Sequence, residues 1–233
     1  MQHVDTLLHA RWIIPIEPAN ALYENYTLVI DAGKIVDCLP TNEAITRYQS
    51  DDVLNMTTHA LLAGFVNAHT HAAMSLLRGI ADDLPLMDWL ENHIWPLEQK
   101  WMSEEFVRDG TDLAIAEMLR GGTTCFNDMY FFPDVTAEQA IKRGMRGVAG
   151  GIIIDFPSVW AKDSNDYIQK ALTLAESLHT HSLTSTTLAP HAPYTVSDEP
   201  LKRVAAHSQE LNLPVHIHVH ETVYEVESAF AQH

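Results

Sequence analysis

Residues Leu61–His71 have the sequence LLAGFVNAHTH, an apolar run that ends in two histidines one residue apart. The run predicts a buried strand of a parallel sheet, in which alternate side chains point to the same face. His69 and His71 then lie about two residues' rise apart on one face, close enough to bind one metal ion. A hydrogen-bonded histidine pair at a strand end fits the same spacing, so the pair alone does not decide between the two interpretations.

The composition describes an ordinary globular chain and excludes several classes of partner. The chain has 233 residues, of which 46% are hydrophobic and 19% charged, enough for one large core or two smaller ones. Fourteen Lys and Arg against 31 Asp and Glu give a formal charge of -17, which opposes binding to nucleic acid and to anionic membrane surfaces.

The cysteines and the N-terminus indicate a cytoplasmic protein. Cys38 and Cys125 lie far apart and form no Cys-x-x-Cys motif, so we expect reduced thiols. The N-terminus lacks a basic region, and Pro15 and Pro18 interrupt the apolar stretch near Trp12. Neither a signal peptide nor a membrane span is therefore predicted.

The pattern of the chain changes near residue 60. In residues 1–60, segment 6–16 predicts a strand, and 27–30 and 34–39 flank Asp31-Ala32-Gly33 as a hairpin. These strands are too few for a closed sandwich, so we expect residues 1–60 to be the N-terminal strands of a composite β-sandwich. From residue 61 strands and helices alternate, with strands expected at 61–68, 123–127, 147–154, 183–188 and 214–219 and helices at 103–119, 136–143, 165–178 and 197–211.

The positions of polar residues distinguish an open parallel sheet from a barrel. A cluster follows each predicted strand: Asn67, His69 and His71; Asn127 and Asp128; Asp155; His191; and His218, His220 and Glu221. Barrels carry their active sites at the C-terminal ends of all strands, whereas open sheets use one switch point. No glycine-rich phosphate loop is present. Residues 61–233 therefore predict about five βα units of a (β/α)8 TIM-type barrel, with the other three strands not in this chain.

The fifth predicted strand supplies further candidate ligands. His216, His218 and His220 alternate onto one face, and Glu221 follows at the strand's end. One of these histidines could complete a metal site, and nitrogen ligands without thiolate suit zinc or a similar divalent ion. A carboxylate beside such a site can move protons between water and substrate. For His216 and His220, satisfied polar packing beside the barrel mouth is the stronger expectation.

Several motifs occur in a fixed order along nearly the whole chain: GFVNAHTH (64–71), SLLRG (75–79), DLPLMDWL (83–90), WPLE (95–98), NDMY (127–130), APHAPY (189–194) and HIHVHET (216–222). Together they resemble the amidohydrolase superfamily, specifically the 5′-methylthioadenosine/S-adenosylhomocysteine deaminases and the neighbouring triazine chlorohydrolases. The resemblance implies that His69, His71 and His218 bind one zinc or similar divalent ion per subunit. It also implies that Glu221 contacts the substrate and is the proton shuttle.

The resemblance assigns three further residues to the substrate. Glu98 matches a carboxylate that accepts hydrogen bonds from the ribose hydroxyls, although a solvated glutamate at a helix end is the ordinary alternative. His191 matches a histidine that contacts the substrate, where the residues alone indicate a turn between Pro190 and Pro193. Trp89 could wall the nucleoside pocket, though tryptophan at helical spacing is more often core.

The chain departs from the family pattern in two places. Some relatives carry an arginine after the third strand, suited to an amino-acid carboxylate, where this chain has Gly150-Gly151. The family also uses a histidine after strand six and an aspartate after strand eight, and both would lie beyond His233. We therefore expect the chain to be an N-terminal fragment of a protein about twice as long.

The resemblance implies hydrolytic deamination of an adenine nucleoside, namely methylthioadenosine, S-adenosylhomocysteine or adenosine, to the inosine derivative and ammonia. Two alternatives stay open: hydrolysis of another ring substituent, as in triazine chlorohydrolases and free-base deaminases, and an inactive fragment that lacks the distal histidine and aspartate. The expected partner is a small nucleoside. The sequence leaves oligomeric state open, and a homo-oligomer of the full-length protein is compatible with it.

Overall fold

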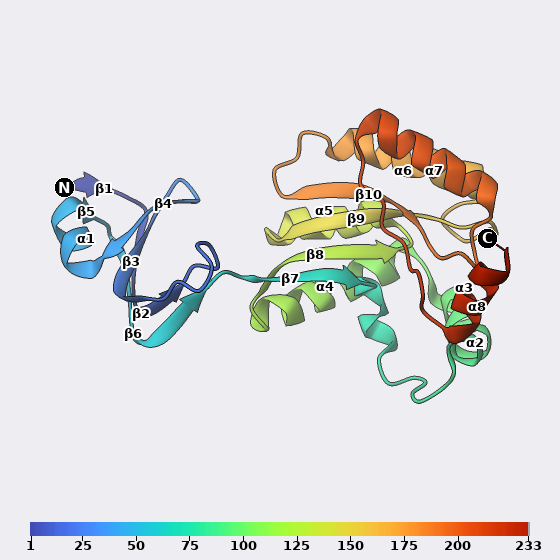
Figure 1. Ribbon diagram of the computed structural model, residues 1–233, viewed down its shortest axis with the longest axis horizontal. Helices are drawn as coiled ribbons and strands as arrows, with labels where there is room; N and C mark the ends of the chain where they lie inside the picture. Colours follow the sequence, from blue (N-terminus) through green and yellow to red (C-terminus); the bar gives the residue numbers. More distant parts are fainter. Residues whose placement is uncertain (233) are drawn as a thin grey trace. The chain divides into compact units, whose positions relative to one another are not determined.

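The computed structural model describes residues 1–232 and consists of two compact units that meet in sequence at Gly64 (Figure 1). The sequence pattern placed this change four residues earlier, near residue 60. Within residues 1–232, no helix has the length and apolar character needed to cross a membrane.

The first unit, Met1–Gly64, is built on a four-stranded sheet. Its strand order is β4-β3-β2-β6, with bounds β2 (Thr6–Ile14), β3 (Tyr23–Asp31), β4 (Lys34–Pro40) and β6 (Asp52–Leu62). The predicted hairpin joins β3 to β4 through Ala32 and Gly33, both in the left-handed region as a tight two-residue turn requires. Around the sheet lie β1 (Gln2–His3), α1 (Thr41–Arg47) and β5 (Tyr48–Gln49).

The second unit begins at Phe65 and contains four parallel strands. These strands are β7 (Phe65–Thr70), β8 (Thr123–Tyr130), β9 (Arg146–Ile153) and β10 (Thr184–Pro190). Their order in space is their order in sequence, as Figure 1 shows. A sheet built this way curls toward a barrel, whereas a doubly wound sheet reverses its strand order at a switch point.

Helices connect these strands at the predicted places. They are α4 (Glu104–Arg120), α5 (Pro133–Arg143), α6 (Ser164–Leu178) and α7 (Asp198–Leu211), followed by α8 (Val223–Gln232). The Ser103 hydroxyl accepts a hydrogen bond from the Phe106 amide at 3.1 Å and begins α4, as the sequence predicts. Ser197 begins α7 without a side-chain cap, and its amide instead donates to Asp155 at 2.8 Å.

The core of this unit lies between the sheet and its helices. Tyr167 and Ile168 of α6 are fully buried and pack in one cluster with Ile153 of β9 and Leu188 of β10. Burying each large apolar side chain contributes about 1.5–3 kcal/mol, so this layer fixes the helices against the sheet. The same packing holds in place the strand ends, which carry the candidate site residues.

The prediction of one buried strand over residues 61–68 is wrong. Leu61 and Leu62 end β6 of the first unit, and the second unit starts a separate strand at Phe65. Phe65 and Val66 are 61% and 66% exposed. They are exposed because β7 has β8 as its one strand neighbour within residues 1–232 and so forms an edge of the sheet.

The prediction of a fifth strand over residues 214–219 is also wrong as regular structure. This segment forms a single parallel bridge, between Leu188 and Val215. It still runs along β10, because the His216 amide donates to the Leu188 carbonyl at 2.9 Å and the His218 amide to the His191 carbonyl at 3.0 Å. The register shifts between these two bonds, because two residues of the segment span three residues of its partner, from Leu188 to His191, and this interrupts a regular ladder.

A long connection between β7 and β8 was not assigned from the sequence. It contains η1 (Ala72–Leu77), α2 (Leu86–Trp89), the π-helical turn η2 (Leu90–Ile94) and α3 (Trp95–Trp101). Pro96 at the start of α3 has no backbone N–H and cannot continue a regular α-helical ladder, which accounts for the wide turn before it.

Gly110 of α4 allows η1, the turn that directly follows His71, to lie close to the helix. A Cβ at Gly110 would lie 2.4 Å from the Ala73 carbonyl oxygen. We expect Gly110→Ala to destabilise the fold, because an overlap with backbone costs about 1–3 kcal/mol and outweighs the gain of up to about 1 kcal/mol in helix propensity. Urea denaturation measures the change.

Gly121→Ala is the matched control for this substitution. A Cβ there would meet its nearest atom at 3.4 Å, an ordinary contact. Its effect should stay within about 0.5 kcal/mol. Equal stability of the two variants would show that α4 and η1 are not in close contact at Gly110.

Candidate metal and substrate site

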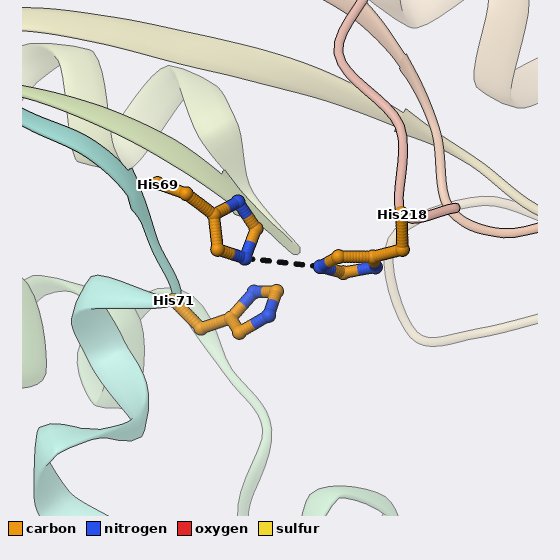
Figure 2. A group of neighbouring side chains, drawn as sticks. All are labelled: His69, His71 and His218. Carbon is orange, nitrogen blue, oxygen red and sulfur yellow. Dashed lines mark hydrogen bonds between the residues drawn. The ribbon is translucent and has the colours of Figure 1, made fainter. Parts of the chain in front are cut away.

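Three histidines from separate segments converge at the C-terminal edge of the sheet. His69 lies near the end of β7, His71 follows that strand, and His218 comes from segment 214–219 (Figure 2). Their ligand nitrogens all lie within 4.8 Å of one another, and the Nε2 atoms of His69 and His218 are 3.0 Å apart. Zinc bound tetrahedrally at about 2.0–2.1 Å from each nitrogen needs neighbouring ligand atoms roughly this close. The donor set therefore fits one divalent ion.

Hydrogen bonds through Nδ1 orient two of these rings, those of His69 and His71. His71 Nδ1 donates to the Met129 carbonyl at 2.5 Å, which leaves Nε2 unprotonated for an ion. His69 Nδ1 lies 2.9 Å from His216 Nε2. Of the three histidines near the fifth predicted strand, the structure thus brings His218 into the group and places His216 against the outer nitrogen of His69. The backbone amide of the third, His220, donates to Glu225 at 2.7 Å.

The electrostatics of the group favour neutral imidazoles. Burial, together with the charges of His218 and His69, lowers the pKa of His71 to about 4, although the hydrogen bond to Met129 acts in the opposite direction. Burial and the neighbouring His69 and His216 lower the pKa of His218 to about 4, and burial also lowers that of His69. Neutral imidazole is the form that binds metal, so these residues need not lose protons at pH 7 to do so.

A buried carboxylate anchors the backbone behind His71. Asp128 is fully buried, and its Oδ1 accepts a hydrogen bond from the Ala72 amide at 2.6 Å. Burial raises the pKa of Asp128 to about 7. The sequence placed Asn127 and Asp128 after their strand, but β8 continues to Tyr130, so both lie within it.

A cavity of about 370 Å³ opens beside the histidine group. Its lining includes His71 and His218 together with Glu98, His191 and Glu221. The rest of its wall is mainly apolar, including Leu86, Trp89, Leu90, Trp95, Ile152 and Phe156. Apolar walls with a few convergent polar groups are typical of small-molecule sites. The structure thus brings the sequence-predicted substrate residues, Trp89 included, around one cavity.

The carboxylate of Glu98 accepts a hydrogen bond from a tyrosine. The Tyr130 hydroxyl donates to Glu98 Oε1 at 2.6 Å. Burial raises the pKa of Glu98 to about 7, while this hydrogen bond acts in the opposite direction by stabilising the carboxylate. Glu98 is therefore a partly buried, hydrogen-bonded carboxylate at the cavity wall, not a solvated glutamate at a helix end.

His191, which also lines the cavity, directly follows β10. Its Nδ1 lies 2.8 Å from the Thr195 hydroxyl, and its ring centroid is 5.0 Å from that of His218. Burial and the neighbouring histidines lower the pKa of His191 to about 3, so the ring is neutral. The Tyr194 hydroxyl donates to Glu221 Oε2 at 2.9 Å, which restrains the candidate proton shuttle.

The comparison at Gly150-Gly151 with an arginine after the third strand is wrong. Both glycines lie inside β9. A Cβ on Gly150 would lie 2.6 Å from the Asp128 carbonyl oxygen, and one on Gly151 would lie 2.4 Å from Ala171 Cβ. Neither position accepts a side chain without movement of the backbone or of α6. The residues after β9 that line the cavity include Ile154 and Phe156, which are apolar.

Sequence reasoning missed Tyr130 and Tyr194, although both lie within quoted motifs. Alternation along β8 places Tyr130 on the same face as Asp128, and this alternation can be seen in the sequence. It went unused because the strand was expected to end at Asn127. Tyr194 lies in a loop after β10, where no periodic pattern indicates the direction of a side chain.

Comparison with known proteins agrees with this geometry. The model of the amidohydrolase family matches residues 60–233, and the chain therefore belongs to that family. It is 48% identical over 227 residues to a 5-methylthioadenosine/S-adenosylhomocysteine deaminase of Saccharophagus degradans, covering 97% of this chain and 51% of the relative. The chain thus spans about half the length of the relatives that it matches.

Solved structures give the same assignment of fold. An adenosine deaminase from Xanthomonas campestris with bound zinc superposes with a TM-score of 0.97 at 47% identity, over 100% of this chain and 53% of that one. An atrazine chlorohydrolase from Arthrobacter aurescens, complexed with zinc, superposes with a TM-score of 0.83 at 19% identity, over 94% and 53%. The second unit is therefore part of an amidohydrolase (β/α)8 barrel.

We expect His218→Ala to weaken zinc binding by more than about 100-fold, because loss of even an outer partner of a ligand costs about 10–100-fold. Competition with a chelator of known affinity measures the change. His59→Ala, at an exposed histidine of β6, is the matched control and should bind zinc as the parent does. Unaltered affinity in the His218 variant would rule this histidine out as a ligand.

Proposed function

We propose that this chain supplies three metal ligands and the nucleoside pocket of an enzyme that deaminates adenine nucleosides by hydrolysis. The substrate is methylthioadenosine, S-adenosylhomocysteine or adenosine, and the products are the inosine derivative and ammonia. The observation that carries the proposal is the shared cavity: His71 and His218 of the histidine group, together with Glu221, line the same cavity as the carboxylate of Glu98. Relatives named for this activity at 48% and 45% identity support it.

In this proposal His69, His71 and His218 hold one zinc or similar divalent ion per subunit. When bound, such an ion supplies Lewis-acid activation of water. Glu221, restrained by Tyr194, takes a proton from the attacking water and delivers it to the adenine ring nitrogen as oxygen adds at C6. It then carries a proton to the departing amine, the C6–N bond breaks, and ammonia leaves. His191, neutral and next to His218, contacts the base as a hydrogen-bonding group.

The sugar end of the site is assigned to Glu98. An ionised carboxylate can accept hydrogen bonds from both hydroxyls of a cis-diol, and Glu98 Oε2 is not the oxygen that Tyr130 occupies. Trp89 and other apolar side chains line the remaining wall. The cavity lining contains no lysine or arginine among the described residues, which suits an uncharged nucleoside.

The alternatives from the sequence differ in observable ways. Likeness to the atrazine chlorohydrolase at 19% identity shows the fold alone. A screen of substrates with different leaving groups distinguishes an enzyme that releases chloride from one that releases ammonia. Ammonia release by this chain alone, compared with the chain joined to any polypeptide encoded downstream, tests the inactive-fragment alternative. Cytoplasmic location and homo-oligomerisation stay predictions.

Glu221→Gln should lower kcat for methylthioadenosine by about 10²–10⁴-fold with little change in KM, because the amide cannot carry the proton. Ammonia release measures kcat. The control Glu227→Gln, at an exposed glutamate of α8, should keep parental activity. Near-parental turnover by the Glu221 variant would remove this residue from the proposed mechanism.

Glu98→Gln should raise KM for ribosides by about 10–100-fold while free bases are affected far less, because one acceptor of the diol is replaced by a donor. Steady-state kinetics with methylthioadenosine and adenine measure the difference. Glu91→Gln, an exposed change on the same connection, is the control. Equal losses for ribosides and free bases would show that Glu98 does not bind ribose.

A further inference from the structure

The end of strand β8 contacts both halves of the site through consecutive residues. The Met129 carbonyl accepts the hydrogen bond from His71 of the metal group, and the Tyr130 hydroxyl donates to Glu98 of the sugar wall. These two partners of β8 come from different parts of the connection between β7 and β8. One short piece of backbone therefore sets the separation between the histidine group and Glu98.

Tyr130 is the fixed member of its hydrogen-bonded pair. It is 3% exposed, its backbone is paired with Gly151 of β9, and its ring packs beside Phe131 with ring centroids 5.4 Å apart. Glu98 belongs to the seven-residue helix α3, which follows the π-helical turn η2. The side chain on the rigid strand therefore positions the one on the short helix.

The contact also decides which way the carboxylate faces. A buried phenol hydroxyl needs an acceptor, so breaking this 2.6 Å hydrogen bond would leave the Tyr130 hydroxyl unsatisfied and would take a donor from the partly buried carboxylate of Glu98. With Oε1 engaged by Tyr130, rotation about the last bond of Glu98 is restrained. A restrained carboxylate presents its accepting oxygens to a diol in a single orientation.

We propose that Tyr130 is a positioning residue that determines selectivity for ribosides, by holding Glu98 at a set distance and orientation from the histidine group. This inference rests on the proposed role of Glu98 in binding ribose. Tyr130 acts through Glu98 and takes no part in proton transfer. Its contribution is therefore confined to substrates that carry the sugar.

The test is Tyr130→Phe in the enzyme that contains this chain, assayed with methylthioadenosine and with adenine. We expect KM for the riboside to rise about 10-fold, kcat to change less than about threefold, and the free base to be unaffected. In the double variant with Glu98→Ala, the tyrosine change should add nothing, because alanine offers the Tyr130 hydroxyl no acceptor to position. Calorimetric binding of the inosine product should weaken by the same factor, and zinc content should be unchanged.

Tyr167→Phe is the matched control, since Tyr167 is a fully buried tyrosine of the same unit that does not line the cavity. It should leave riboside KM unchanged. Glu98→Asp is a second test that keeps Tyr130 intact: the shorter side chain loses the hydrogen bond and should show the same riboside-selective rise in KM.

Three outcomes would overturn the inference. Equal losses for riboside and free base in Tyr130→Phe would indicate a merely structural role. Multiplying effects in the double variant would show that Tyr130 acts independently of Glu98. If Glu98→Gln itself does not discriminate ribosides from free bases, the proposed ribose site fails first and this inference with it.

Discussion

The hydrogen bond from His71 to the Met129 carbonyl is the contact on which the arrangement of the site depends. It joins a residue that lies just beyond β7 to the end of β8, past the last β7–β8 pair, Thr70 with Asp128. The adjacent contact from the Ala72 amide to the buried Asp128 carboxylate anchors the same turn from the other side. Both partners belong to the C-terminal end of β8, where Asp128, Met129 and Tyr130 are buried, so the turn after His71 is anchored to a buried strand end. Donation from Nδ1 also leaves the opposite nitrogen of His71 facing its neighbours.

Burial and hydrogen bonding give the two carboxylates of the cavity different environments. Glu98 is desolvated at the wall, with a pKa raised to about 7 and a tyrosine as its donor. Glu221 lies on the exposed loop after segment 214–219, held by Tyr194, and its amide donates to Glu225 at 3.1 Å. A recognition group gains from a fixed place, whereas a proton carrier needs access to water and substrate. Tyr130 and Tyr194 thus each restrain one carboxylate of the cavity, and the proposed function gives these two carboxylates different roles.

Much of this could be predicted from the sequence, because the signals are local. Ser103 indicates the start of α4, alternating βα patterns give the parallel sheet, and motif order identifies the family before any contact is known. The failures are non-local. Exposure of Phe65 depends on which strands flank β7, and the interrupted ladder of segment 214–219 depends on a register shift against the chain at and after β10. Residue type alone did not choose among the three histidines near the fifth predicted strand; the family resemblance indicated His218, which the structure places in the group.

The π-helical turn Leu90–Ile94 has a consequence for the angular phase of the helix that follows it. Each residue of an α-helix advances its side chain by about 100° around the axis. A π turn closes its hydrogen bond one residue later than an α turn, so α3 is rotated relative to α2 by roughly that amount. With a regular turn in its place, Trp89 and Glu98 would not face the same cavity. The π-helical turn therefore rotates α3 relative to α2 so that side chains of both helices line the same wall of the cavity.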